Sequence, residues 1–228
     1  MPTTKRIVVS WSGGKDAAWT LHQLRSAGEG EVVGLVTSVV PELGRSAMHG
    51  VRVELVRAQA RSAGLPLLEV PLPWPCTNAR YESAFLAGLS EARALWGVTH
   101  VAFGDLFLED IRAYRERLLD GSQLEPLFPL WHQPTRELLD AMLTAGLRAT
   151  IVCLDPAQLD RRFAGRTLDR ALAAELPGDV DPCGERGEFH TFVTAGPMLW
   201  GTVAVQPGDM VERDGFVYSD LRAVAANG

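Results

Sequence analysis

Apolar residues along the chain gather either into short continuous runs or into longer segments where they recur at helical spacing. The continuous runs predict buried strands at residues 7–9, 31–37, 65–70, 98–103 and 149–154. The helically spaced segments predict helices at residues 16–24, 51–63, 77–96, 109–119 and 135–145. Because strands alternate with helices, we expect an α/β fold built on a parallel, doubly wound sheet with right-handed crossovers.

The pattern changes in the second half of the chain, and we place a domain boundary near Gly121. The expected domains are residues 1–121 and a smaller C-terminal α/β domain at residues 122–228, with residues 125–131 as an apolar connector. Beyond these, apolar stretches predict antiparallel strands at 200–205, 209–213 and 216–219. Asp214-Gly215 supplies the hairpin turn between the last two.

A loop of small and polar residues joins the first predicted strand to the first helix, and it reads Ser10-Trp11-Ser12-Gly13-Gly14-Lys15-Asp16. The first N–H groups of a helix lack intrahelical partners, and the helix dipole adds positive charge there. The two glycines let a phosphate approach the backbone, the two serines can donate hydrogen bonds, and the lysine carries a full charge. The aspartate would repel a bare phosphate, so its position indicates a bridging Mg²⁺.

Spacing excludes two better-known phosphate loops. A Walker A motif needs glycine where this chain has Val9, and serine or threonine where it has Asp16. The dinucleotide motif fails because Gly13 and Gly14 are adjacent. The remaining pattern, S-x-S-G-G-K-D, resembles the PP-loop of ATP pyrophosphatases, which cut ATP between its α- and β-phosphates and form an adenylated intermediate.

A second dense cluster of polar residues spans residues 184–191, with the sequence G-E-R-G-E-F-H-T. Glu185 and Glu188 flank a glycine turn, and His190 follows. If residues 188–193 are extended, Glu188 and His190 share one face of a strand. They could orient a nucleophile, bind a metal or hold a cationic substrate.

Several motifs occur in one order along the chain, and the set is more specific than any one of them. They are residues 12–16 (S-G-G-K-D), 103–105 (F-G-D), 129–131 (P-L-W), 184–192 and 196–197 (G-P). This arrangement resembles the diphthine–ammonia ligase family of ATP pyrophosphatases, in a bacterial-type variant. The resemblance implies a Rossmann-like, adenine nucleotide alpha hydrolase-like domain and a smaller domain that closes the active cleft.

The resemblance also implies a reaction, its cofactors and its site residues. A carboxylate would attack the α-phosphate of ATP with Mg²⁺, pyrophosphate would leave, and ammonia would displace AMP to give an amide. The expected nucleotide-binding residues are Ser10, Ser12, Gly13, Gly14, Lys15, Asp16, His49, Gly104 and Asp105. The expected catalytic residues are Lys15, Asp16, Glu185, Glu188 and His190, with Asp16 also as the metal ligand.

Two positions depart from the family pattern. Ala17 replaces the usual serine of the PP-loop and removes one hydroxyl contact to phosphate. His190 stands where diphthine ligases usually carry glutamate, which changes the charge of the acceptor site. The resemblance therefore supports the type of reaction more strongly than the identity of the substrate. The acceptor could be a small carboxylate or a modified protein side chain.

Composition and charge limit the kinds of binding partner and the cellular compartment that we expect. The chain has 228 residues, 46% of them hydrophobic, and a formal charge of −6, which disfavours broad nucleic-acid binding. The apolar runs are too short to span a membrane, and the first strand begins too early for a signal peptide. Three widely spaced cysteines without a C-x-x-C pair fit a reduced cytoplasmic compartment.

The sequence is also compatible with two other functions. One alternative is a PP-loop enzyme of the RNA-thiolation type, and another is a non-catalytic adenine-nucleotide sensor. Ammonia is expected to come free in solution, and the strand-rich tail could pair between chains in a homodimer. We interpret Arg112, Arg115 and Arg117 as a salt-bridged surface in preference to a phosphate clamp.

Overall fold

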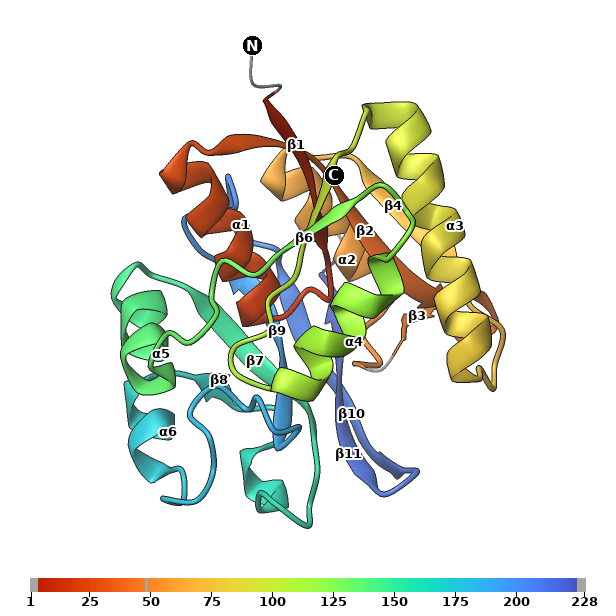
Figure 1. Cartoon of the computed structure of the whole chain (residues 1–228). Helices are drawn as coiled ribbons and strands as arrows, with labels where there is room; N and C mark the ends of the chain where they lie inside the picture. The colour runs from red at the N-terminus through yellow and green to blue at the C-terminus, as the bar shows by residue number, and fades with distance from the viewer. Residues whose placement is uncertain (1–3, 48, 225–228) are drawn as a thin grey trace.

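The computed structural model of the chain describes residues 4–47 and 49–224, and the first half forms a parallel sheet (Figure 1). Its strands are β1 (Lys5–Ser10), β2 (Gly30–Val40), β4 (Leu67–Pro71), β5 (His100–Ala102) and β6 (Glu125–Leu127). They lie in the order β4-β2-β1-β5-β6, and every neighbouring pair is parallel. A short strand, β3 (Arg45–Ser46), pairs antiparallel with the end of β2.

Helices cover both faces of this sheet, and the alternation of side chains along β1 shows how. The helices are α1 (Lys15–Ala27), α2 (Val53–Ala63), α3 (Asn78–Trp96) and α4 (Glu109–Leu119), with a 3-10 turn at Pro41–Leu43. Ile7 and Val9 belong to the core that contains α1 and α2, whereas Val8 packs with α3 and α4. Successive strand residues point to opposite faces, so the continuous apolar run of β1 fills two layers of core.

The second half forms a separate, antiparallel sheet around a central strand. Its strands are β7 (Arg148–Leu154), β8 (Thr167–Leu168), β9 (Phe189–Ala195), β10 (Val205–Arg213) and β11 (Phe216–Ala223). β7 pairs with β9, β8 and β11, and β10 pairs with β11 at the edge. Its helical elements are α5 (Thr135–Thr144), α6 (Arg170–Glu175) and a 3-10 turn at Arg161–Phe163.

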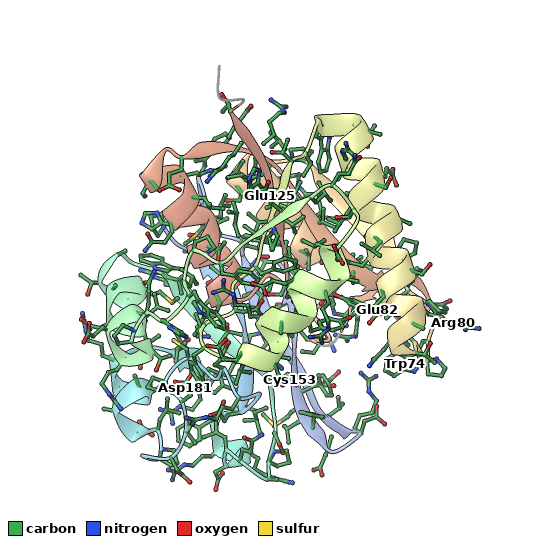
Figure 2. All side chains as sticks on the ribbon, in the orientation of Figure 1. Trp74, Arg80, Glu82, Glu125, Cys153 and Asp181 are labelled. Carbon is green, nitrogen blue, oxygen red and sulfur yellow. The ribbon has the colours of Figure 1, made fainter. Side chains whose placement is uncertain are left out.

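Most of the predicted elements are present, and two are wrong. Residues 125–131 are not simply a connector, because Glu125, labelled in Figure 2, begins β6 and extends the parallel sheet. No strand occupies most of 200–205, since β10 begins at Val205. The hairpin turn at Asp214-Gly215 is confirmed, with positive φ at both residues, as a type I′ turn requires. The boundary near Gly121 stays a prediction.

The two sheets share one hydrophobic core. Phe192 and Val193 of β9 lie in the same buried cluster as Trp11 and Ala17, which flank the β1–α1 loop. The second sheet is therefore packed against the end of the first, at the edge where its parallel strands finish. Within the described residues, no helix is long and apolar enough to cross a membrane.

The fold predicts a clear cost for one added methyl group. A Cβ built at Gly88 of α3 would lie 2.4 Å from Val70 Cγ2 on β4. We expect Gly88→Ala to lower the free energy of unfolding by about 1–3 kcal/mol, since overpacking outweighs the better helix propensity of alanine. Gly178→Ala is the control, because nothing lies within 4 Å of a Cβ there. Urea denaturation measures both, and equal midpoints would contradict the close packing.

Candidate active site

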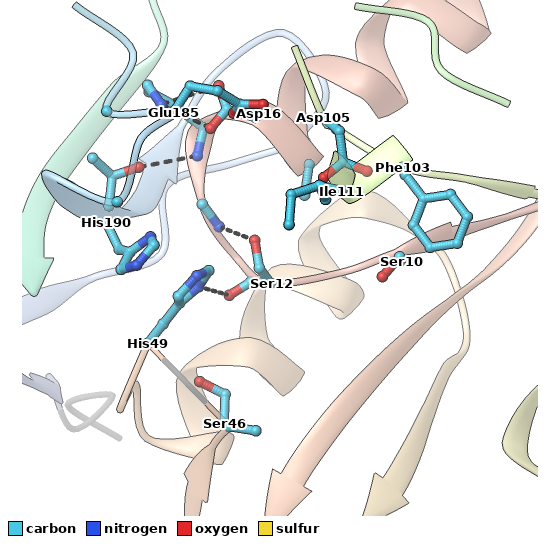
Figure 3. A pocket seen from close by; sticks show the side chains of 18 of the residues that line it. Ser10, Ser12, Asp16, Ser46, His49, Phe103, Asp105, Ile111, Glu185 and His190 are labelled. Atoms are coloured by element: carbon cyan, nitrogen blue, oxygen red, sulfur yellow. Dashed lines mark hydrogen bonds and ion pairs between the residues drawn. The ribbon is translucent and has the colours of Figure 1, made fainter. Parts of the chain in front are cut away.

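A cavity of about 570 Å³ lies where the parallel strands end and the second sheet begins. Its wall includes the β1–α1 loop, the end of β2, the segment after β5 and the start of α3. The opposite wall comes from residues 184–187 and 189–191, which lead into and start β9. Figure 3 shows side chains from both walls around the cavity, among them Ser12, Asp16, Asp105, Glu185 and His190.

The glycine loop and β9 are joined by backbone and side-chain hydrogen bonds. Gly13 has a φ of +81°, which only glycine adopts without strain, and Gly14 is the N-cap of α1. The Gly14 N–H donates to Ser12 Oγ at 3.2 Å, and the Lys15 N–H donates to Thr191 Oγ1 at 3.1 Å. The second sheet thus satisfies one donor at the helix N-terminus and leaves that terminus facing the cavity.

Gln59 of α2 is buried and connects three parts of the structure. Its Nε2 donates to the carbonyl oxygens of Gly13 at 2.9 Å and Val193 at 2.6 Å. Its Oε1 accepts from Trp11 Nε1 at 3.0 Å. A buried amide with this many partners holds the loop in one conformation, because each of these polar groups would otherwise be buried without a partner.

Lys15 is almost completely buried, and its ammonium group lies at the centre of the site. Its Nζ is 2.7 Å from Asp16 Oδ2 and also donates to the carbonyl of Cys183. Burial alone lowers the pKa of Lys15, but the charges of Asp16 and its other neighbours outweigh it and raise the pKa. The lysine is therefore a fixed positive charge beside the N-terminus of α1.

The segment after β5 approaches the start of α1 very closely. A Cβ at Gly104 would lie 2.9 Å from the carbonyl carbon of Asp16, so only glycine fits without movement. Asp105 follows, and its Oδ2 lies 3.6 Å from Arg115 Nε. Burial raises the pKa of Asp105, and the guanidinium of Arg115 opposes that shift. Arg115 also lines the cavity, so its interpretation as a surface residue is wrong.

Glu185 faces the cavity and has an unusual protonation equilibrium. Its Oε1 accepts from the Leu106 N–H at 2.7 Å, which links the second sheet to the segment after β5. Burial raises the pKa of Glu185 to about 7, with Asp16 and Asp105 adding to the shift and the hydrogen bond opposing it. This carboxyl group can therefore take up or release a proton near neutral pH.

Glu188 does not share a cavity face with His190. Its buried carboxylate accepts from the Asp181 N–H at 2.8 Å and the Arg186 N–H at 2.9 Å. β9 begins only at the next residue, and Glu188 is not among the residues that line the cavity. The side chain therefore stabilises the turn that presents Glu185, and the expected shared face is wrong.

His190 instead contacts His49, which comes from the first half of the chain. The two imidazole rings are stacked, with centroids 4.3 Å apart (Figure 3). His49 Nδ1 lies 3.4 Å from the Ser12 carbonyl oxygen, a geometry that suits donation from this nitrogen. Burial lowers the pKa of His49 to about 4 and that of His190 well below its usual value. Both rings are therefore neutral at pH 7.

The structure brings most of the predicted site residues to one cavity. Gly13 and Glu188 are the exceptions, and both support the wall from behind; the others are Ser10, Ser12, Gly14, Lys15, Asp16, His49, Gly104, Asp105, Glu185 and His190. Within the described residues, no group of three or more histidine, cysteine, aspartate or glutamate side chains is arranged to hold a metal ion.

Sequence reasoning missed three residues of this site. Gln59 lies on the apolar face of α2, between Leu55 and Ala63, and a polar residue in such a stripe is a signal of a buried hydrogen bond. Arg115 lies four residues after Ile111, which also lines the cavity, so helical spacing could have placed it. Nothing in the local sequence indicates that Thr191 caps α1.

Comparison with known proteins identifies similar chains over most of the length. Residues 5–124 match the family model of the diphthamide synthase N-terminal domain, and residues 134–218 match that of the C-terminal domain. The chain is 24% identical to the diphthine–ammonia ligase of Bos taurus and 23% identical to that of Homo sapiens, over 90% of this chain and 85% of each relative. It is 25% identical to the ligase of Schizosaccharomyces pombe over 88% of this chain, but spans only 36% of that longer relative.

The Gln59 connection yields a stability prediction. Gln59→Leu keeps the volume but removes the partners of Trp11 Nε1 and the Val193 carbonyl. We expect the free energy of unfolding to fall by about 1–3 kcal/mol, because buried polar groups lose hydrogen bonds. Gln206→Leu, at an exposed position on β10, is the matched control. If both variants unfold at the same urea concentration, Gln59 does not hold the loop.

Proposed function

Because the chain belongs to the diphthamide synthase family, we propose that it is an ATP-dependent amide ligase that releases AMP and pyrophosphate. In this proposal it adenylates a carboxylate and then transfers ammonia to it; a ligation to ammonia is what the names of its relatives describe. The observation that carries the proposal is the meeting of two walls in one cavity. A helix N-terminus with a buried lysine forms one wall, and Glu185 and His190 form the other.

The first wall suits the phosphates of ATP. The strand order β4-β2-β1-β5-β6 supports a Rossmann-like, doubly wound sheet, and such sheets bind nucleotides where the strand order reverses. The β1–α1 loop lies at that reversal. Lys15 and the backbone of Gly14 would bind phosphate oxygens, with Ser10 and Ser12 beside them and Gly104-Asp105 on the nucleotide side, while Gly13 supports the loop from behind.

The carboxylates at this wall fit a magnesium ion. Asp16 is 28% exposed towards the cavity, and Oδ2 of Asp105 is buried without a hydrogen-bond partner. Mg²⁺ in nucleotide sites takes one or two carboxylates together with phosphate oxygens, so this pair is sufficient. Bound there, the ion would neutralise charge on the departing pyrophosphate.

Each wall of the cavity is proposed to assist one step of the reaction, adenylation at the first wall and ammonia attack at the second. Negative charge develops on the pyrophosphate as the acceptor carboxylate attacks the α-phosphate, and Lys15 and the N-terminus of α1 stabilise it. Ammonia then attacks the acyl carbon and AMP leaves. The attacking ammonia must give up a proton as the amide forms, and Glu185 can accept that proton because its pKa is about 7. Glu188 contributes by holding the turn that carries Glu185.

The acceptor is proposed to be a carboxylate without a strong cationic group. We expected His49 on the nucleotide side, but we now propose it for the acceptor side, because its neutral ring is stacked on that of neutral His190. This part of the wall offers imidazole N–H and N groups and no negative charge. The family usually places a glutamate there, which would favour a cation. A small carboxylate with free ammonia is therefore the first substrate class to test.

The lysine content of the chain gives a clean test of the proposal. Lys5 and Lys15 are its two lysines. With Mg²⁺, ammonium and a panel of carboxylates, we expect release of AMP and pyrophosphate from ATP, and Lys15→Met to slow it by roughly 10²–10³-fold. Lys5→Met, on β1 with a partly exposed side chain, should keep wild-type activity. Release of ADP and phosphate would refute the AMP-forming ligase, and tight ATP binding without turnover under every condition would refute it in favour of a nucleotide sensor.

Glu185 gives a separate, pH-based prediction. Its carboxylate form becomes dominant as pH rises through about 7, so the ammonia-dependent rate at fixed free ammonia should rise over the same interval. Glu185→Gln should remove this rise and lower the rate at pH 8. Glu29→Gln, at an exposed position, is the control. An unchanged pH profile in Glu185→Gln would exclude this residue as the proton acceptor.

A further inference from the structure

The segment that carries His49 is held from the opposite half of the molecule by one carboxylate. This segment, residues 45–47 and 49–52, connects β3 to α2. Arg45 Nη1 lies 2.8 Å from Asp220 Oδ1, and Arg52 Nη2 lies 2.7 Å from Asp220 Oδ2. Asp220 belongs to β11, in the second sheet. One side chain thus receives a guanidinium from each end of the segment.

The alternation of side chains along β11 explains why Asp220 points to this segment. Val217, Ser219 and Leu221 are buried beneath the strand, so residues 216, 218 and 220 share the other face. Phe216 lines the cavity, and Tyr218 lies under Gly50, where a Cβ would be 3.0 Å from its ring. Gly50 has a φ of +66°, so the backbone turns there directly on the tyrosine.

The two ion pairs of Asp220, with Arg45 and with Arg52, are here called the Asp220 clamp, and the surrounding charges favour its formation. The Asp220 side chain is 9% exposed, so solvent screens its ion pairs weakly. Burial raises the pKa of Asp220, but the hydrogen bonds and charges of Arg52 and Arg45 outweigh it and lower the pKa. Arg45 Nη1 also donates to the Gly50 carbonyl at 2.6 Å, which closes the segment on itself. The carboxylate is therefore ionised and fully engaged near neutral pH.

The clamp fixes the position of His49 at the cavity wall. His49 lies between Arg45 and Arg52, next to Gly50, and its ring meets both Ser12 and His190. If the two arginines were released, the segment would lose its charged links to β11, and His49 could move away from His190. The match to the C-terminal family model ends at residue 218, so Asp220 lies beyond it.

We propose that Asp220 is a positioning residue of the active site, which acts through Arg45 and Arg52 to hold His49 against His190. These two histidines belong to the acceptor wall, which is the side of the cavity proposed to bind the acceptor carboxylate. The hairpin of β10 and β11 is in this way part of the catalytic apparatus and not only an edge of the second sheet. The inference rests on the proposed function for its consequence in catalysis, whereas the clamp itself can be tested without any substrate.

The first experiment measures the accessibility of the histidines. Diethyl pyrocarbonate modifies accessible, uncharged imidazoles, and peptide mass spectrometry assigns each modified residue. At pH 7 we expect Asp220→Asn to speed modification of His49 and His190 by about tenfold, as expected when a local opening becomes easier. His132, 61% exposed at its side chain, is the internal standard and should not change. Asp140→Asn, which removes an exposed partner of Arg170 on another part of the surface, is the matched control.

A second variant and a double variant guard against a general loss of structure. Arg52→Met leaves Arg45 paired with Asp220, so its modification rates should fall between those of wild type and Asp220→Asn. The double variant Arg52→Met/Asp220→Asn should react no faster than Asp220→Asn alone, because the side-chain hydrogen bonds of Arg52 go to Asp220. Unchanged rates in Asp220→Asn, or equal acceleration at all five histidines in a chain that still melts cooperatively, would overturn the clamp.

ATP turnover separates this inference from the proposed function. If the chain releases AMP and pyrophosphate, Asp220→Asn should raise the KM for the carboxylate or ammonia several-fold and leave the KM for ATP unchanged. An equal rise in the KM for ATP would contradict a role at the acceptor wall. If wild type shows no turnover, the proposed function fails, while the modification experiment still decides whether Asp220 holds His49.

Discussion

The site depends above all on how the carbonyl of Gly13 is hydrogen-bonded. This oxygen accepts from the Val193 N–H of β9 at 2.9 Å and from Gln59 Nε2 of α2 at 2.9 Å. The glycine loop is thereby built into the second sheet and the second helix at once. Because the loop ends where α1 begins, these bonds also fix the direction in which the helix N-terminus and Lys15 face. A cavity with one wall from each half of the chain requires such a rigid junction.

The charge states of the cavity side chains depend on the same packing of the glycine loop against β9, because that packing buries them. Lys15 is a buried cation held by Asp16 and the Cys183 carbonyl, and it adjoins a second acid, Glu185. Burial raises the pKa of Glu185 and lowers the pKa of both histidines, so the acceptor wall is close to neutral at pH 7. Lys15 keeps its positive charge beside the N-terminus of α1. This separation suits a reaction that binds a polyanion on one side and activates a weak nucleophile on the other.

Two residues show why local patterns mislead about the site. Glu188 and His190 alternate correctly for a strand, yet the chain turns before Phe189, and the carboxylate binds backbone N–H groups of that turn. The pairing of β7 with β9 also shifts register beside His190, where Val152 of β7 is an extra, unpaired residue. Arg115 has charged neighbours typical of a surface helix, but α4 lies against the cavity and turns this side chain towards Asp105.

The sequence by itself determined the strand and helix pattern, the glycine loop at the N-terminus of α1, the turn of the final hairpin and the family. These features depend on neighbours within a few residues or on the order of short motifs, and both can be seen in a linear chain. The tertiary structure alone decided that Thr191 caps α1, that Gln59 joins the loop to β9, that His49 meets His190 and that Asp220 holds two arginines 168 and 175 residues earlier. Such contacts join positions far apart in the chain, and their geometry exists only after the two sheets have packed together.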